Sequence, residues 1–398
     1  MRILFALPYG PGPTRVRSRM LLEQLAARHQ VTLLTLCWSD EDWEDSQAWA
    51  ARGVSVRCVA HGRSKRLRGL CGHPGRPLQQ IAATSPAYAR QARLEVAEAR
   101  RQGAPFDAIH VEHLRGAVAI DLPRSLGLHT IFDAVDCLAE LARLTAAHNP
   151  SALYRLVARH EERRTARLEA RMLGAADLVT VAAERDRQAL LMNDSHARVL
   201  TVPNGAVVRG EPIRLPSAPR VVFTGKLSYH ANQAAARWLL EQVWPRVRAR
   251  VPSAELTLAG ADPPSWLREA CLLPDVQVVA NPVDLSAIVA SARVALAPIV
   301  YSVGIQNKVL EAMALGVPVV GTSSAAAGLH RDGGQALGVA DDPEAFAALV
   351  ADVLTSDSVA RRLSSAGYEY VRRHHSWPGV ADRFEELYLS SPRHAEAA

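Results

Sequence analysis

The chain has 398 residues and a formal net charge of +6, from 46 basic and 40 acidic residues. This length is too great for one ordinary core and predicts two domains of about 150–200 residues each. Much of the basic excess lies in Arg-rich stretches such as "RHEERRTARLEAR". Neighbouring Glu residues favour a solvated helix face there over a surface that contacts anionic lipid or phosphate. Nucleic acid is disfavoured, because no stacking aromatic residues lie among the arginines.

Five cysteines are scattered along the chain without the spacing of a metal site: Cys37, Cys58, Cys71, Cys137 and Cys271. This pattern is typical of reduced, mostly buried thiols in a cytoplasmic protein. The apolar run near the N-terminus is too short for a signal peptide, and no run of about 18 apolar residues occurs. We therefore expect a cytoplasmic protein that does not span a membrane, with peripheral contact to the inner membrane face left open by its basic surface.

The first half of the chain alternates short apolar runs with helical patterns, and a helix is expected from about Thr14. The candidate strands are "RILFAL" (2–7), "VTLLTL" (31–36), "VSVRCV" (54–59), "FDAIHV" (106–111), "HTIFDAV" (129–135), "ADLVTVA" (176–182) and "ARVLTV" (197–202). Strands that alternate with helices imply a parallel sheet with helices on both faces. The basic, Gly-rich stretch 61–80 is expected to be mobile.

The alternation stops at 203–219, "PNGAVVRGEPIRLPSAP", which is rich in Pro and Gly and has no period, as a linker would be. It then restarts with the candidate strands "RVVFTG" (220–225), "AELTLAG" (254–260), "VQVVA" (276–280), "RVALAPI" (293–299) and "VPVVGT" (317–322). We predict an α/β fold with two Rossmann-like domains, 1–203 and 220–375, joined by a linker at 204–219 and followed by a final helix within 376–398.

Doubly wound domains bind ligands beyond the carboxyl ends of their strands, and the stretch "GIQNKVLEAMALGVPVV" (304–320) follows such a strand. Gly304 lets the backbone approach a ligand, and a helix that begins at about Ile305 turns its positive end to the same place, which favours phosphate. Lys308 and Glu311 are neighbours on one helix face. An ammonium suits a diphosphate, and a carboxylate accepts hydrogen bonds from vicinal hydroxyls such as those of ribose. A surface Lys–Glu pair is the alternative, which the apolar residues around the pair disfavour.

The stretch 304–320 resembles the nucleotide-binding signature of retaining glycosyltransferases of the glycosyltransferase-B fold, family 4, and most of all the branch associated with exopolysaccharide and other cell-surface sugar transfer. Similarity extends to "VVFTGKLSYHANQAAARWLLEQVWPRV" (221–247), "LTLAGADPP" (256–264) and "VDLSAIVASARVALAPI" (283–299). The resemblance implies two domains that face a cleft and a C-terminal helix that crosses back to the first domain. It also implies transfer of a sugar from a UDP- or GDP-linked donor to a hydroxyl acceptor, with retention of configuration and without cofactor or metal.

In the second domain, the resemblance assigns donor binding to three loops. Lys226 follows Gly225 at a strand end and is implied as a phosphate ligand with a catalytic role, unless it is only a surface lysine. Many relatives carry a Glu eight residues before the position of Glu311, where this chain has Val303, so backbone amides are expected to contact the sugar instead. The implied donor set is Gly225, Lys226, Gly260, Val303, Gly304, Ile305, Gln306, Asn307, Lys308 and Glu311, and Glu311 is also counted as catalytic.

The first domain should hold the acceptor. Its loop "LPYGPGPTRVRSR" (7–19) lacks the GxGxxG dinucleotide fingerprint. By resemblance, Gly10 and Gly12 bring the backbone near the donor phosphates and Arg17 contacts them. The alternative is that the arginines only cover a helix surface.

Polar residues also follow two later strands of this domain. His113 is implied beside the transferred sugar as a catalytic residue, with an ordinary loop histidine as the alternative, whereas His110 lies inside a strand and is expected to be structural. The side chains expected on the acceptor side are Glu112, Arg115, Asp133 and Asp136. Helix capping is the alternative for Asp136.

Two other functions remain open from the sequence. A sugar-nucleotide epimerase has the same architecture, but it needs acid and base carboxylates around the sugar, where this chain has Val303. A non-catalytic nucleotide-sugar-binding protein would keep Glu311 and release no free nucleotide. For a transferase, the acceptor can be a saccharide, a lipid-linked saccharide or a natural-product aglycone.

Overall fold

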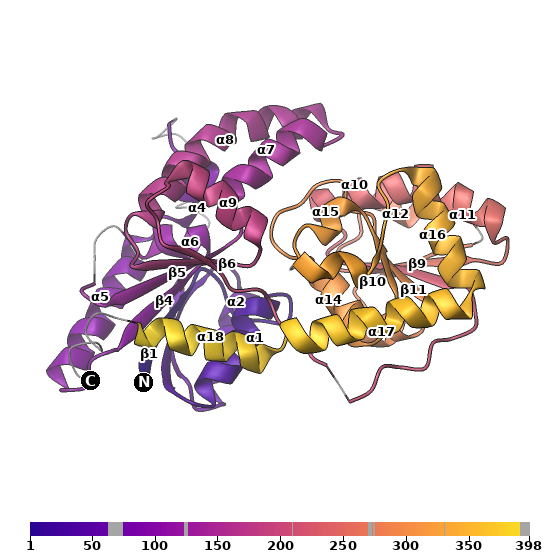
Figure 1. Ribbon diagram of the computed structural model, residues 1–398. Coiled ribbons are helices and arrows are strands. Elements are labelled where there is room, and N and C mark those ends of the chain that lie inside the picture. The colour runs from indigo at the N-terminus through magenta and orange to yellow at the C-terminus, as the bar shows by residue number, and fades with distance from the viewer. Residues whose placement is uncertain are drawn as a thin grey trace. The chain divides into compact units, whose positions relative to one another are not determined.

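The computed structural model of the protein describes residues 1–62, 75–122, 126–208, 210–269, 273, 275–329 and 331–390. The chain divides into two compact units. Unit 1 consists of Met1–Arg143, Val157–Pro203 and the segment from Trp377 on, and unit 2 consists of Leu144–Leu156 and Asn204–Ser376. Each unit has its own parallel sheet with helices around it (Figure 1), which confirms the predicted α/β class with two Rossmann-like domains.

The sheet of unit 1 has the strand order β3-β2-β1-β4-β5-β6-β7, and its described pairings are parallel. The strands are β1 (Arg2–Leu7), β2 (Gln30–Cys37), β3 (Ser55–Ala60), β4 (Ala108–Glu112), β5 (His129–Val135), β6 (Leu178–Val181) and β7 (Val199–Thr201). The helices are α1 (Val16–Ala26), α2 (Asp40–Ala50), α4 (Leu78–Ala83), α5 (Pro86–Arg101), α6 (His113–Ala119), α7 (Leu138–His148), α8 (Ala152–Leu173), α9 (Glu184–Asn193) and α18 (Trp377–Leu389).

Side chains of this sheet alternate between two hydrophobic cores, one on each face. In β1, Leu4 and Ala6 belong to one core, and Ile3, Phe5 and Leu7 belong to the other. This is the period of two that a strand imposes on its side chains, and here both faces are apolar because helices cover both.

The C-terminal helix α18 completes the second of these cores. Trp377, Phe384 and Tyr388 are buried there with residues of β1 and of α1, next to which α18 lies in Figure 1. A hydrogen bond of 2.9 Å also joins the Tyr388 hydroxyl to Nδ1 of His110 in β4. The expected return of the last helix to the first domain is therefore confirmed.

The sheet of unit 2 has the order β10-β9-β8-β11-β12-β13 and is also parallel in its described pairings. The strands are β8 (Arg220–Thr224), β9 (Glu255–Gly260), β10 (Val276–Ala280), β11 (Val294–Ala297), β12 (Val319–Gly321) and β13 (Gly338–Val339). The helices are α10 (His230–Trp238), the π-helical turn η1 (Leu239–Val243), α11 (Trp244–Arg250), α12 (Ser265–Arg268), α13 (Leu285–Ala290), α14 (Asn307–Ala314), α15 (Ser323–Ala326), the 3-10 turn η3 (Arg331–Gln335), α16 (Pro343–Thr355) and α17 (Asp357–His374).

The Pro-rich segment expected as a linker is bound to unit 2 where it is described. The Asn204 carbonyl oxygen accepts a hydrogen bond from His375, Ala206 pairs with Ser376, and the Ile213 amide donates to the Leu315 carbonyl. Where it is described, the segment forms no helix or strand of its own, in agreement with its lack of a hydrophobic period. Within the expected first domain, residues Leu144–Leu156 group with unit 2.

The described cysteines are free thiols, as the sequence predicts. Cys37 and Cys137 are buried free thiols and Cys58 is a partly exposed one, whereas Cys71, Cys271 and most of the basic stretch 61–80 lie outside the described residues. Within the described part of the chain, no helix combines the length and the apolarity that a membrane crossing requires.

Candidate functional site

The strand order of unit 2 reverses between β8 and β11. Strands β9 and β10 are added on one side of β8, and strands β12 and β13 are added on the far side of β11. At such a switch point the loops at the carboxyl ends of the two strands separate and leave room for a ligand. The loop after β8 carries Gly225 and Lys226, and the loop after β11 leads to α14. The sequence-predicted donor residues of unit 2 lie in these loops, at the end of β9 and on the first turns of α14.

Two backbone turns and the side chain of Lys308 meet closely at this edge. Gly225 and Gly260 have φ angles of +144° and +155°, which favour glycine. A Cβ atom on Gly260 would lie 1.7 Å from the Gly225 carbonyl oxygen, and a Cβ atom on Gly225 would lie 3.0 Å from Nζ of Lys308. Glycine is therefore required at both turns, and the structure brings Gly225, Gly260 and Lys308 together as the sequence predicted.

Lys308 presents an ammonium group in a poorly hydrated position. Its Nζ donates to Oδ1 of Asn232 at 2.7 Å and lies 4.5 Å from the centre of the Phe223 ring. Burial lowers the pKa of Lys308 to about 7, and Glu311 opposes this shift only in part. Such an ammonium gains stability from any anion that binds beside it, because a negative charge restores what the lost water supplied.

Glu311 and Lys226 are the two exposed members of the predicted set. Glu311 reaches solvent from α14, although removal of part of its water by the surrounding protein raises the pKa of its carboxyl. The Lys226 side chain is 63% exposed, and its Nζ lies 3.8 Å from Oδ2 of Asp262. An exposed pair at this distance contributes little to stability, so Lys226 can turn toward a ligand at small cost.

The loop before α14 is anchored by its apolar side chains. Val303 and Ile305 are buried, and Gly304 has a φ of +64°. Gln306 is the residue that precedes the first turn of α14, so this helix begins two residues later than the sequence suggested. The Asn307 side chain accepts a hydrogen bond of 2.8 Å from Nδ2 of Asn204, which fixes its orientation.

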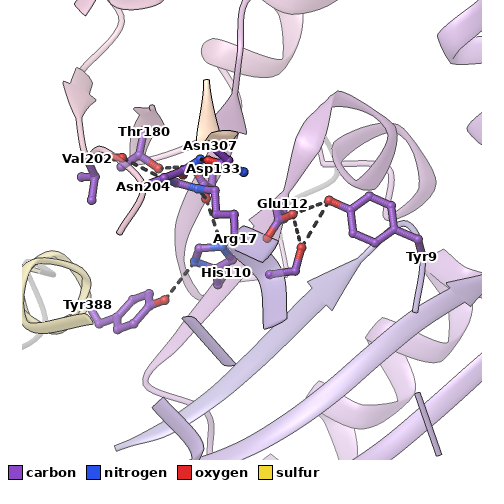
Figure 2. A network of polar contacts seen from close by, with 11 residues as sticks. Tyr9, Arg17, His110, Glu112, Asp133, Thr180, Val202, Asn204, Asn307 and Tyr388 are labelled. Atoms are coloured by element: carbon purple, nitrogen blue, oxygen red, sulfur yellow. Dashed lines mark hydrogen bonds and ion pairs between the residues drawn. The ribbon is translucent and has the colours of Figure 1, made fainter. Parts of the chain in front are cut away.

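The corresponding switch point of unit 1 lies between β1 and β4 and contains a buried ion pair (Figure 2). Arg17 donates through Nε and Nη2 to the two oxygens of Asp133, at 2.6 and 2.9 Å, and through Nη1 to the Val202 carbonyl. Thr180 also donates to Asp133. Burial lowers the pKa of Arg17, but the carboxylate beside it more than compensates and leaves this pKa raised.

Three predictions for this edge are wrong. Arg17 is 5% exposed and bound to Asp133, so its guanidinium is unavailable to a donor phosphate. Asp133 is fully buried, and Glu112, 1% exposed, accepts hydrogen bonds from the hydroxyls of Tyr9 and Ser18 (Figure 2), so neither carboxylate faces an acceptor. Desolvation raises the pKa of Glu112 to about 7, with a further contribution from the charge of Asp133.

The two glycines of the β1 loop pack against α2, and the approach of their backbone to a donor phosphate stays a prediction. A Cβ atom on Gly10 would lie 2.3 Å from the Asp42 carbonyl oxygen, so packing against the backbone of α2 requires glycine there, and one on Gly12 would lie 1.8 Å from the Asp45 carboxylate of the same helix. The Gly10 amide donates to Oδ1 of Asp42, and the Gly12 amide donates to the Gly10 carbonyl. Neither amide is left for a phosphate.

His113 has a backbone conformation that residues other than glycine rarely adopt. It has a φ of +64° directly after β4, and its Nδ1 accepts a hydrogen bond of 3.3 Å from the Arg115 amide. This acceptor role leaves the proton of the neutral ring on Nε2. Desolvation, followed by the positive charges of Arg115 and Arg15, lowers the pKa of His113 to about 3, so the ring is a neutral hydrogen-bond donor at pH 7. Backbone strain of this kind often accompanies function.

Asp136 does not cap α7, the alternative that the sequence left open. The first amides of that region donate to other carboxylates: Cys137 donates to Asp186 at 3.0 Å, and Leu138 donates to Glu169 at 2.6 Å. Burial and the nearby charge of Asp186 raise the pKa of Asp136 to about 7. Its acceptor-side role therefore stays a prediction.

His110 is structural, as expected. It is fully buried and stacks on Phe5 with 4.4 Å between ring centres. Its ligand atoms lie within 4.8 Å of those of Glu112 and Asp133, which is a spacing that suits a metal ion. The positive charge beside Asp133 is instead supplied by the Arg17 guanidinium.

A family model described as "Glycosyl transferases group 1" matches residues 218–356, from β8 to α16. No curated protein matches the chain by sequence. The donor-side residues predicted from the sequence, from Gly225 to Glu311, all fall within the matched residues.

Solved structures extend the likeness to the whole chain. The chain is similar to sucrose-phosphate synthase from Thermosynechococcus elongatus, at 18% identity with a TM-score of 0.69, covering 100% of this chain and 99% of that one. It is also similar to HepE of Anabaena in complex with UDP and glucose, at 14% identity with a TM-score of 0.68, covering 98% and 100%. A UDP-forming α,α-trehalose-phosphate synthase from Burkholderia xenovorans gives 13% identity, a TM-score of 0.62, and 98% of both chains. These likenesses show the glycosyltransferase-B fold.

Several residues that shape the candidate site of unit 2 are not among the predicted site residues. Asn232 holds Lys308, and Asn204 holds Asn307. A Cβ atom on Gly328 would lie 2.6 Å from the Gly304 carbonyl oxygen, so this glycine lets the loop before α14 pack. Asn232 lies in the first turn of α10, within the stretch 221–247 already singled out in the sequence, whereas the other two carry no local signal.

Proposed function

We propose that the protein is a retaining, metal-independent glycosyltransferase of family 4 that acts in the cytoplasm in the synthesis of a polysaccharide or another cell-surface glycan. It takes a sugar from a UDP- or GDP-linked donor and transfers it to a hydroxyl of a saccharide, a lipid-linked saccharide or an aglycone. The observation that carries the proposal is the meeting of Gly225, Gly260 and Lys308 at the switch point of unit 2. A poorly hydrated ammonium beside two close backbone turns suits a diphosphate.

The chemistry requires stabilisation of the leaving nucleoside diphosphate. Lys308 and Lys226 balance the charge that grows on the diphosphate as its bond to the anomeric carbon breaks. The acceptor oxygen bonds to that carbon on the same face, and its proton passes to the leaving phosphate oxygen, so no protein nucleophile is needed. Glu311 accepts hydrogen bonds from the ribose hydroxyls, and the neutral His113 ring of unit 1 donates to the sugar.

Relatives of the same fold suggest where to begin the search for the donor. HepE of Anabaena was solved with UDP and glucose, and the Burkholderia enzyme is UDP-forming. These neighbours support UDP-linked sugars as the first donors to test. The free thiols of Cys37, Cys58 and Cys137 support the proposed cytoplasmic setting.

The test has two stages. Thermal shift with a set of UDP- and GDP-linked sugars should identify a stabilising donor, and release of the nucleoside diphosphate is then measured with and without an acceptor pool, in the presence of EDTA. We expect acceptor-dependent release that EDTA does not reduce. Conversion of the donor to its epimer without release would instead identify an epimerase, and binding without any turnover would identify a nucleotide-sugar-binding protein. Absence of stabilisation by every donor would overturn the proposal.

A further inference from the structure

Unit 1 has a cavity of about 450 Å³ within the layer of helices that covers one face of its sheet. It is lined by α4 and the segments next to it, the first half of α5, the end of α6 and the end of α8 (Figure 1). Because α8 leads into β6 and α6 runs away from the carboxyl end of β4, this part of the lining lies toward the amino ends of the strands. The volume is within the range of small-molecule sites.

The charged lining of the cavity is mostly basic. It consists of Arg76, Arg90, Arg93, Arg171 and Asp121. Arg93 is already paired, since its Nη2 lies 3.7 Å from Oδ2 of Asp121. Arg76, Arg90 and Arg171 are exposed, and their side chains form no ion pair and no hydrogen bond within the described parts of the chain. The cavity therefore has three guanidinium groups whose charge no lining carboxylate balances.

Arg171 is also the last member of a row of arginines along α8. The row has a spacing of four residues and consists of Arg159, Arg163, Arg167 and Arg171. Like charges at this spacing destabilise a helix. Two carboxylates of the same helix are bound to backbone amides instead: Glu161 accepts from Leu78 at 2.7 Å, and Glu169 accepts from Leu138 at 2.6 Å. The row therefore does not serve the stability of α8, and its charge remains available to an anion.

The floor of the cavity is apolar and belongs to the hydrophobic core. Val118, Ala119 and Met172 line it, are at most 8% exposed, and pack in the core that α5, α6 and α8 share. Among the neutral polar groups of the lining, the Thr84 hydroxyl donates to the Gln80 carbonyl at 2.7 Å. The guanidinium groups are therefore the charged donors that the cavity offers, above a floor that the core holds in place.

We propose that this cavity is an anion site apart from the proposed donor site, and that it binds the phosphate of a phosphorylated ligand through Arg76, Arg90 and Arg171 while the apolar part of the ligand lies on the floor. A guanidinium donates paired hydrogen bonds to phosphate, and a phosphomonoester carries about two negative charges near pH 7. The phosphate belongs to a soluble ester or to a lipid headgroup, which present the same group to the arginines. None of the residues that line the cavity is assigned to the donor or the acceptor, so this site does not depend on the proposed function.

The soluble arm of the test titrates phenyl phosphate into the full-length protein. Phenyl sulfate is the comparison, because it has a similar shape and a smaller negative charge. We expect phenyl phosphate to bind about tenfold more tightly and this preference to shrink when salt is raised to roughly 0.5 M. Hydrogen exchange should slow in the first half of α5 and at the end of α8 when phenyl phosphate is bound. Equal affinity for the two compounds, or slower exchange in unit 2 alone, would refute the phosphate site.

The lipid arm measures cosedimentation with phosphatidylcholine vesicles prepared with and without phosphatidic acid. Binding to the phosphatidic acid vesicles that is lost on replacing the cavity arginines would identify a lipid headgroup as the source of the phosphate. Arginine-dependent binding of phenyl phosphate without binding to these vesicles would identify a soluble ester. Either result supports the site, and dependence of neither probe on the arginines would overturn it.

Variants decide whether this cavity is responsible. Arg90→Gln and Arg171→Gln should each remove most of the preference for phosphate, and both should fold like the wild type because the side chains are exposed and unpaired. Arg101→Gln is the matched control, since it makes the same change of charge at the end of the helix that carries Arg90 and lies outside the cavity lining. Wild-type preference in both cavity variants, or an equal loss in the control, would contradict the proposal. None of these measurements uses a nucleotide sugar, so failure of the proposed transferase would leave their outcome unchanged.

Discussion

Replacing Lys308 with methionine separates a residue placed for binding from one placed for stability. Burial lowers the pKa of Lys308 from 10.5 to about 7, which corresponds to a penalty of about 5 kcal/mol for keeping the charged form folded. The wild type also has the hydrogen bond to Asn232 and the contact with the Phe223 ring, which methionine would lose and which together stabilise the folded protein by about 2–4 kcal/mol. Methionine has a similar length and no charge. We therefore expect the ligand-free variant to be more stable than the wild type near pH 7, by about 1–3 kcal/mol.

The pH dependence of this difference follows from the direction of the shift. The pKa of Lys308 is lower in the folded protein than in the unfolded chain, so protonation opposes folding most strongly below about pH 7. This penalty disappears as the pH rises from about 7 toward 10.5. The stability gain of Lys308→Met should therefore be greatest near pH 6–7 and should decrease as the pH rises from about 7 toward 10.5. Comparing the two proteins at each pH cancels the titration of other groups.

Binding of a nucleotide sugar should change in the opposite direction. Loss of a charge-assisted contact with the diphosphate should weaken binding of UDP-glucose by about tenfold or more. UDP-glucose is a suitable probe because its diphosphate keeps its two charges over this pH range. Wild-type affinity should fall above pH 7, where free Lys308 becomes neutral, whereas the affinity of the variant should stay flat.

Hydrogen exchange followed by mass spectrometry measures the stability of unit 2 separately from that of unit 1, and calorimetry measures affinity. Lys226→Met is the matched control, because this exposed lysine of the neighbouring loop should change stability by no more than about 0.5 kcal/mol. A Lys308→Met protein that is less stable at every pH and binds UDP-glucose as the wild type does would refute the reasoning. Lys308 would then serve only to hold Asn232.

Three further substitutions test other residues. Glu311→Gln should weaken donor binding by about 1–3 kcal/mol without loss of stability, since a charged acceptor of hydroxyl hydrogen bonds is removed from an exposed position; unchanged affinity in calorimetry would rule out contact with ribose. His113→Ala should lower turnover and leave nucleotide affinity intact, and His113→Gly, which accepts a φ of +64° without strain, should do the same; wild-type turnover in both would return His113 to an ordinary loop residue. Arg17→Met should destabilise unit 1 by about 3–5 kcal/mol in chemical denaturation, because Asp133 is left buried and unpaired, and adding Asp133→Leu should recover most of the loss; a stable Arg17→Met protein that only loses nucleotide binding would restore the role that the structure denies to Arg17.

The donor side of the candidate site could be read from the sequence because its signals are local. Gly225, Lys226 and Gly260 follow recognisable buried strands, and Lys308 and Glu311 share one face of a short helix. A parallel sheet brings the carboxyl ends of its strands to one edge whatever the exact packing, so placing these residues on strand ends was enough to predict that they meet.

The acceptor side depended on contacts between residues far apart in the chain. Arg17 and Asp133 are 116 residues apart, and only the assembled sheet of unit 1 shows that they neutralise each other. The family resemblance implies that Gly10 and Gly12 lie near the donor phosphates, and only the structure shows that α2 packs against both.

What the sequence by itself determined is the architecture, namely two doubly wound units with a final helix, and the edge of the second unit at which a phosphorylated ligand would bind. These follow from hydrophobic period and from the residues next to each strand, which are properties of short segments. The tertiary structure alone decided which charged groups are buried in ion pairs and which are exposed. Arg17 is paired with Asp133, whereas Arg15, two residues earlier, is exposed at a cavity. The physical reason is that burial and pairing depend on three-dimensional neighbours, and no spacing along the chain encodes whether a guanidinium finds a carboxylate on a distant strand.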